Sequence, residues 1–141
     1  MMCATEKYVT FFDRLDKNTP IEEYKNYFDE NSYFEDPFQK VVGVDKIYHI
    51  FEDMYAKLHN PRFMIEEFVS NNNLSYIKWT FIYQMDENSQ EQSFVGVSRV
   101  RFGENAKVLS HVDFWDAGAN IYEKIPILGS VIRYIKRKIH A

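Results

Sequence analysis

Two short segments of the chain combine ionisable side chains with aromatic neighbours. The first is Phe34-Glu35-Asp36-Pro37-Phe38, and the second is His111-Val112-Asp113-Phe114-Trp115-Asp116. An ionised carboxylate is costly to place among apolar rings, so it usually has either a partner or a chemical task. We therefore treat Asp36, His111 and Asp113 as candidate catalytic residues for chemistry that moves a proton.

Asp36 has two interpretations. Desolvation by Phe34, Phe38 and other rings would raise its pKa and make it a general base. Alternatively, Asp36 caps a turn before Pro37 and has no catalytic role.

The second segment has the alternation of a strand, which places His111, Asp113 and Trp115 on one face. A His–Asp pair on one face can act as an oriented acid–base unit. The pair could also give two ligands to a metal ion, with Asp36 as the third. Two ligands at this spacing are weak evidence, so we expect neither a metal nor another cofactor. A third interpretation is a polar network that only stabilises the rim of the fold.

Three amphipathic helices are predicted in the first part of the chain. The first begins near Thr5. The second has Thr19 as its N-cap, Pro20 at its first position and Glu22 completing a capping box. The third follows Gly43 and ends at Asn60-Pro61. Their buried stripes contain, in chain order, Tyr8, Phe11, Phe12 and Leu15; Ile21, Tyr24, Tyr27 and Phe28; and Ile47, Ile50, Phe51, Met54, Tyr55 and Leu58.

Five strands are predicted, a short one at residues 32–36 and four more at 62–70, 74–85, 92–102 and 107–115. The strand at 74–85 alternates most clearly, with Ile77, Trp79, Phe81, Tyr83 and Met85 on one face. Short turns between the last four strands indicate an antiparallel meander. An amphipathic helix at about 118–140 follows. The fold class is therefore α+β, with helices over one face of a curved sheet, in a single domain at 1–141.

The composition favours a cavity and argues against nucleic-acid binding. The chain has 12 Phe, 10 Tyr and 2 Trp, enough ring surface for a large core, an aromatic-lined cavity or both. The net charge is −4, although four basic residues lie among the last nine, and without them 13 basic residues face 21 acidic ones. An acidic body lacks the basic surface that nucleic acids require.

The basic tail has two interpretations. Its cationic residues could make a weak contact with an anionic membrane surface. We favour the alternative, in which its apolar stripe closes the fold or a dimer interface while its basic face is solvated. The basic residues of the tail are Arg133, Lys136, Arg137 and Lys138.

The chain has no signal-like apolar run and no stretch of about 20 apolar residues, so we expect a cytoplasmic location.

This order of elements resembles the nuclear transport factor 2-like superfamily, and most closely its SnoaL-like and ketosteroid-isomerase-like branch. The specific features are Glu35-Asp36-Pro37, Gly43 before the third helix and the last strand ending in Phe114-Trp115. The tail from His111 to Arg137 is also similar to that of a group of small bacterial proteins of the superfamily. The resemblance covers nearly the whole chain. It implies a cone in which a bent antiparallel sheet wraps around helices and leaves a pocket at its open end, and it implies a homodimer formed through the sheet.

The resemblance also implies roles for particular residues. The general base of ketosteroid isomerases lies in an Asp-Pro segment, which corresponds to Asp36 here. Their oxyanion-hole Tyr and Asp correspond to Phe12 and Ser98, and neither provides the same hydrogen-bond donor. We therefore do not expect steroid isomerisation by that mechanism. The ligand pocket is expected to be lined by Phe12, Tyr55, Trp79, Ser98 and Trp115.

These features predict a pocket for a lipid-, steroid- or polyketide-like hydrophobic molecule. In it, Asp36 and the His111–Asp113 pair would catalyse isomerisation, dehydration or cyclisation without a cofactor. One alternative is a non-catalytic carrier or sensor of such a molecule. Another is a dimeric protein-interaction module, which we favour least because a protein-binding surface does not require these three residues around an aromatic cavity. The sequence leaves open whether the protein is a catalyst or a binder.

Overall fold

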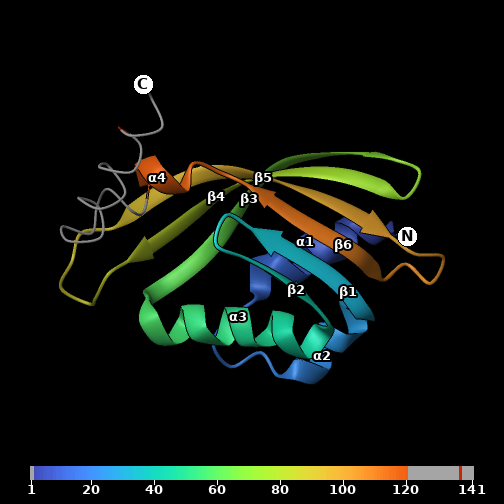
Figure 1. Ribbon diagram of the computed structural model, residues 1–141, viewed down its shortest axis with the longest axis horizontal. Coiled ribbons are helices and arrows are strands. Elements are labelled where there is room, and N and C mark those ends of the chain that lie inside the picture. The colour runs from blue at the N-terminus through green and yellow to red at the C-terminus, as the bar shows by residue number, and fades with distance from the viewer. Residues whose placement is uncertain (1, 121–136, 138–141) are drawn as a thin grey trace.

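A computed structural model shows helices packed against one face of a curved six-stranded sheet (Figure 1). It describes residues 2–120 and 137. The α+β fold class is confirmed. The helices are α1 (Ala4–Arg14), α2 (Ile21–Tyr27), α3 (Val44–Lys57) and the short α4 (Ala117–Asn120). The strands are β1 (Phe28–Asp36), β2 (Gln39–Val42), β3 (His59–Asn71), β4 (Leu74–Gln84), β5 (Gln92–Phe102) and β6 (Val108–Phe114).

The sheet has the strand order β2-β1-β6-β5-β4-β3. As predicted, β3 to β6 form an antiparallel meander. The pairing of β1 with β6 is parallel, which makes the sheet mixed rather than wholly antiparallel. Local sequence patterns cannot reveal this pairing, because β1 and β6 are far apart in the sequence, with β2, α3, β3, β4 and β5 between them. Bulges in β3 near Arg62 and Glu67 accompany the curvature of the sheet.

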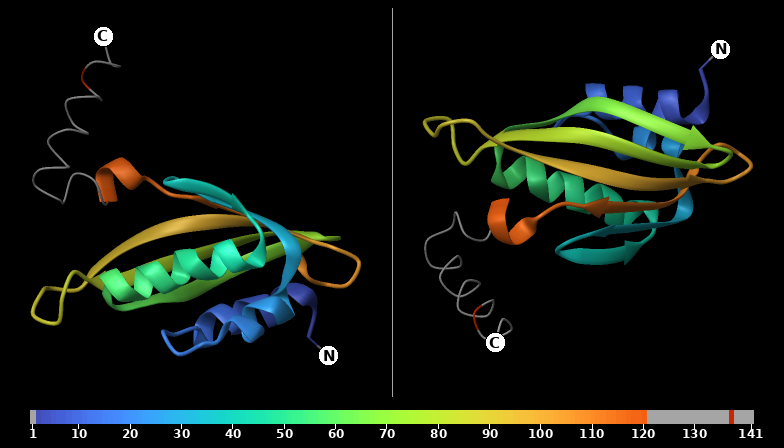
Figure 2. Two further views of the ribbon diagram at one scale, coloured as in Figure 1. Left: turned by 60° about the horizontal axis from the view of Figure 1, so that its bottom comes forward. Right: turned by 90° about the horizontal axis from the view of Figure 1, so that it is seen from above.

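The helices α1, α2 and α3 lie together on one side of the sheet (Figure 2). The core between the two layers is strongly aromatic. Tyr8 of α1, for example, is 1% exposed and makes edge-to-face contacts with Phe12, Phe28 and Phe102. On β4 the predicted alternation is confirmed for Ile77, Trp79, Phe81 and Tyr83, which are all buried. Met85, the last residue of the predicted face, follows the end of the strand and is 52% exposed.

Several predicted boundaries differ from the structure. Pro20, and not Thr19, is the N-cap of α2, and no side chain caps that helix. The hydroxyl of Thr19 instead accepts a hydrogen bond from the backbone N–H of Asp16 at 3.1 Å, which closes the preceding turn. Phe28 begins β1 rather than ending α2, and α3 ends at Lys57, before Asn60-Pro61. The short strand β2 was not predicted.

The predicted helix at about 118–140 lies almost entirely outside the described residues. The structure shows its beginning as α4 and places the exposed Arg137 in a helix. Arg133, Lys136 and Lys138 lie outside the described residues, so the interpretations of the basic tail remain predictions. None of the helices in the described part of the chain has both the length and the apolar character needed to cross a membrane.

Candidate functional site

A cavity of about 680 Å³ lies between the inner face of the sheet and α3. Its wall is mostly aromatic and aliphatic, and both tryptophans of the chain, Trp79 and Trp115, contribute to it. The carboxyl groups of Asp36 and Asp113 also line it. The cavity therefore combines a large apolar surface with a few polar groups, which is the usual composition of a small-molecule site.

The register of the sheet brings the two carboxylates into the same region. In the parallel pair, Phe34 lies beside His111 and Glu35 lies beside Val112, so that Asp36 follows next to Asp113. The rings of Phe34 and His111 stack with centroids 4.9 Å apart. Because side chains alternate along a strand, Asp36 and Asp113 share the face of Phe34 and His111, which is the inner face.

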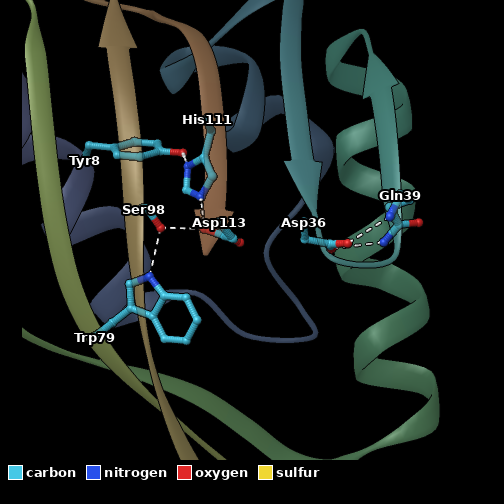
Figure 3. Close-up of polar contacts among 7 residues, drawn as sticks. All are labelled: Tyr8, Asp36, Gln39, Trp79, Ser98, His111 and Asp113. Atoms are coloured by element: carbon cyan, nitrogen blue, oxygen red, sulfur yellow. Dashed lines mark hydrogen bonds and ion pairs between the residues drawn. The ribbon is translucent and has the colours of Figure 1, made fainter. Parts of the chain in front are cut away.

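A chain of hydrogen bonds holds Asp113 in place (Figure 3). The Tyr8 hydroxyl lies 2.7 Å from Nδ1 of His111, and Nε2 of His111 lies 2.6 Å from Oδ1 of Asp113. The same Oδ1 accepts a hydrogen bond from the Ser98 hydroxyl at 2.5 Å, and Ser98 in turn accepts one from the indole N–H of Trp79 at 2.8 Å. Four side chains, one each from α1, β4, β5 and β6, thus fix the orientation of the Asp113 carboxylate.

The direction of these bonds follows from the carboxylate of Asp113, which only accepts hydrogen bonds, so Nε2 of His111 donates to its Oδ1. In the tautomer with its proton on Nε2, the ring accepts at Nδ1 from the Tyr8 hydroxyl. Burial, and secondarily the charge of Asp113, raises the pKa of Tyr8 well above its ordinary value, so this hydroxyl keeps its proton. None of the described residues donates to the other oxygen, Oδ2. Asp113 also lines the large cavity.

Asp36 is held by the turn between β1 and β2. Its Oδ1 accepts hydrogen bonds from the backbone N–H groups of Phe38 and Gln39 at 2.8 and 3.1 Å, and its Oδ2 accepts one from the side-chain amide of Gln39 at 3.1 Å. Figure 3 shows the carboxylate directed towards Gln39. The capping contact of the second interpretation is therefore present. Even so, desolvation raises the pKa of Asp36, although these hydrogen bonds oppose it, and Asp113 raises it further.

We predict that Asp36→Asn becomes more stable relative to the wild type as the pH rises. With the pKa of Asp36 raised in the fold, the folded protein binds this proton more tightly than the unfolded chain. Wild-type stability therefore falls as the pH rises from the ordinary pKa of 3.8 through the raised value, whereas asparagine has no such loss. Urea unfolding of both proteins at about pH 4 and about pH 7 measures the effect. An unchanged difference in the free energy of unfolding would contradict it.

Four of the five residues expected in the ligand pocket divide between two cavities. Trp115 follows the end of β6, stacks on Phe94 at 4.3 Å and lines the large cavity. Phe12 and Ser98 line a smaller cavity of about 20 Å³ beneath it, as does His111. Trp79 and Asp113 line both cavities and form the boundary between them.

Tyr55, which we expected in the same pocket, lies elsewhere. It lines a separate cavity of about 250 Å³ beside Tyr24 and Tyr48. The reason is the pitch of α3, on which Tyr48 and Tyr55 are seven residues apart and share a face. That face is turned towards α2, whereas Met54, one position earlier, lines the large cavity.

Tyr8 is the site residue that the sequence did not predict. Its place in the helical stripe indicated an ordinary core position, and the superfamily's tyrosine corresponded to Phe12, about one turn later. The bond between Tyr8 and His111 joins residues 103 positions apart, so no local pattern reveals it. Among residues 2–120 and 137, no group of three or more His, Cys, Asp or Glu side chains could hold a metal ion.

Comparisons with known proteins agree with this architecture. The family model described as a SnoaL-like domain matches residues 7–111. No match is found among curated proteins.

Three solved structures illustrate the likeness in fold. A candidate SnoaL-like polyketide cyclase from Jannaschia sp. CCS1 superposes with a TM-score of 0.72 and 11% identity, over 82% of this chain and 87% of its own. TerC, co-crystallised with polyporic acid, has a TM-score of 0.68 and 14% identity, and the match covers 82% of this chain and 91% of that chain. The third structure is a protein with a ketosteroid isomerase-like fold from Catenulispora acidiphila, in complex with trimethylamine. It has a TM-score of 0.70 and 10% identity, and the match covers 84% of this chain and 88% of that chain.

Proposed function

Because the chain belongs to the SnoaL-like family, we propose that its large cavity binds a hydrophobic small molecule and that Asp113 accepts a proton from that molecule. The observation that carries this proposal is the arrangement of Asp113. One oxygen is fixed by two hydrogen bonds, and the residue lines an aromatic cavity of about 680 Å³. Two proteins of similar fold have been crystallised with small molecules, polyporic acid and trimethylamine, which is consistent with a ligand here.

The reaction class follows from the groups available. A carboxylate in an apolar cavity suits removal of a proton from a carbon next to a carbonyl group, a step common to isomerisation, dehydration and cyclisation. Asp36, beside Asp113 in the sheet, is a second group able to give or take a proton. His111 lines only the smaller cavity, so its role is to orient Asp113 rather than to touch the substrate.

Proton transfer can be tested before the natural substrate is known. β-Tetralone is a hydrophobic ketone with acidic protons next to its carbonyl group. In D2O the protein should speed the exchange of these protons for deuterium, as followed by proton NMR, and Asp113→Asn should reduce the added rate about a hundredfold. Asp53→Asn is the control, because Asp53 lines the cavity but is paired with Lys57 at 2.8 Å. An Asp113→Asn variant as fast as the wild type would exclude Asp113 as the base.

The same assay separates a catalyst from a carrier. A carrier would bind the ketone, with a change in the fluorescence of the two cavity tryptophans, and would leave its exchange at the rate of buffer. That result would favour a non-catalytic binding protein, with Asp36 in its turn-capping role and Asp113 as a fixed polar contact for the ligand.

We further propose that two copies pair through the outer face of the sheet. By alternation with buried neighbours, the outer face carries exposed apolar side chains, which water-facing sheets usually lack. They are Met64, Val69, Tyr76, Val95 and Phe114, each at least 43% exposed. A second copy of this face would cover them, because a two-fold interface uses the same surface on both subunits.

For the pairing, we predict that Val95→Glu converts a dimer into a monomer. A charge at this position would be buried without a partner at the centre of the interface. Sedimentation velocity should give twice the chain mass of 16.9 kDa for the wild type and the single mass for the variant. Val42→Glu is the control, since Val42 is 58% exposed but lies on the edge strand β2. A monomeric wild type at about 100 μM would contradict the pairing.

A further inference from the structure

Among the described residues, the charges around the large cavity do not balance. Of the described residues that line it, Asp36, Asp53 and Asp113 are acidic and Lys57 is basic. Lys57 is engaged with Asp53 on the exposed side of α3, where both side chains are more than half exposed. Asp36 and Asp113 therefore line an apolar wall with no Lys or Arg side chain of the described chain paired to them.

Aromatic rings line the same cavity as these carboxylates. Phe38 meets the ring of Trp115 edge to face at 5.3 Å, and Trp115 stacks on Phe94. All three residues line the cavity together with Asp36. The negative faces of aromatic rings attract an ammonium group, and tryptophan does so most strongly. Within the described residues, the one cation–π contact formed by the protein itself is between Arg14 and Tyr27, away from the cavity.

The burial of the carboxylates points in the same direction. The side chain of Asp113 is only 12% exposed, and desolvation raises the pKa of Asp36. An ionised carboxylate in apolar surroundings is stabilised by an opposite charge, and a ligand can supply that charge when the protein does not. A carboxylate ligand would instead add a third negative charge.

We infer that the preferred ligand carries a protonated amine or quaternary ammonium group on a hydrophobic body, with the cation near Asp36 and Asp113 and against the rings of Phe38 and Trp115. This inference rests on the proposed function and narrows it, because it names the ligand class of the same cavity. Anionic molecules such as fatty acids are disfavoured, although they fall within the lipid-like class expected from the sequence.

Two probes of equal shape test the inference. The para-hydroxyphenyltrimethylammonium ion and para-tert-butylphenol differ in having a positively charged nitrogen or a neutral carbon at one position. Binding is followed through the indole N–H signals of Trp79 and Trp115 in ¹H–¹⁵N spectra. We expect the cation to bind about tenfold more tightly than the phenol. Asp36→Asn and Asp113→Asn should each reduce this preference several-fold. The control Asp45→Asn, which removes an exposed carboxylate that does not line the cavity, should keep it.

The outcomes separate the inference from the proposal on which it rests. If the phenol binds as tightly as the cation, or if neither asparagine variant at positions 36 and 113 alters the preference, the inference is wrong while the hydrophobic site stands. If neither probe moves the indole signals, both the inference and the proposed function are contradicted. The neutral phenol also shows whether an asparagine variant retains its fold, since its binding does not depend on charge.

Discussion

Alanine at position 96 should destabilise the protein by about 1–3 kcal/mol and disturb the site. Gly96 lies opposite Trp79 in the pairing of β4 with β5. A Cβ atom at Gly96 would lie 2.3 Å from Cη2 and 2.4 Å from Cζ2 of the Trp79 ring, far inside van der Waals contact. The ring is 4% exposed and its N–H is bonded to Ser98, so it cannot move aside without losing packing and a hydrogen bond.

Urea unfolding and near-ultraviolet circular dichroism measure the two parts of this prediction. The free energy of unfolding should fall, and the tryptophan signal of the folded protein should change because Trp79 is displaced. Gly103→Ala is the matched control, since its new Cβ would meet its nearest neighbours at 3.3 Å, which small shifts can relieve. If Gly96→Ala is no less stable than Gly103→Ala, the packing of Trp79 against β5 is wrong.

Replacing His111 by phenylalanine should cost about 3 kcal/mol. The ring would still fill the space beside Phe34, but it could neither accept from Tyr8 nor donate to Asp113. The Tyr8 hydroxyl, which is fully buried, would lose its partner, and the carboxylate would lose one of its two donors on Oδ1. Unpaired buried polar groups carry most of the cost of such substitutions.

A double-mutant cycle isolates the contact with Tyr8. Tyr8→Phe alone should cost about 1–2 kcal/mol, because it leaves Nδ1 of His111 without a donor. In the double variant the orphaned hydroxyl is also removed, so the loss should be smaller than the sum of the single losses by about 1 kcal/mol. Strictly additive losses would show that Tyr8 and His111 do not act together.

The sequence predicted the fold well where the determinants are local. The alternation of residues 74–85 identified β4 and its buried face, and the helical stripe after Gly43 identified α3. The parallel pairing of β1 with β6 was not predicted, since it depends on the closing of the whole sheet. The four-residue strand β2 was also missed, because its exposed residues show no alternation in hydrophobicity.

The candidate site was predictable in part, for a related reason. Strand alternation placed His111 and Asp113 on one face, and the structure has them there, bonded to each other. The partner on the other side of His111 is Tyr8, and its contribution depends on a contact between distant elements. The turn that holds Asp36 shows the capping contact of one interpretation, whereas the role of Asp36 as a base stays a prediction. Its hydrogen bonds explain its capping role, while its burial favours a role in proton transfer.

The most direct test of the central claim is a ¹H–¹⁵N titration of the protein with the neutral para-tert-butylphenol. The chain has 2 tryptophans and both line the large cavity, so the two indole N–H signals report on that cavity. We predict that both signals move and saturate together, while the backbone amides of Val69 and Val95 on the outer face stay in place. If the indole signals do not move up to the solubility limit of the phenol, or if the outer face alone responds, the large cavity is not the ligand site.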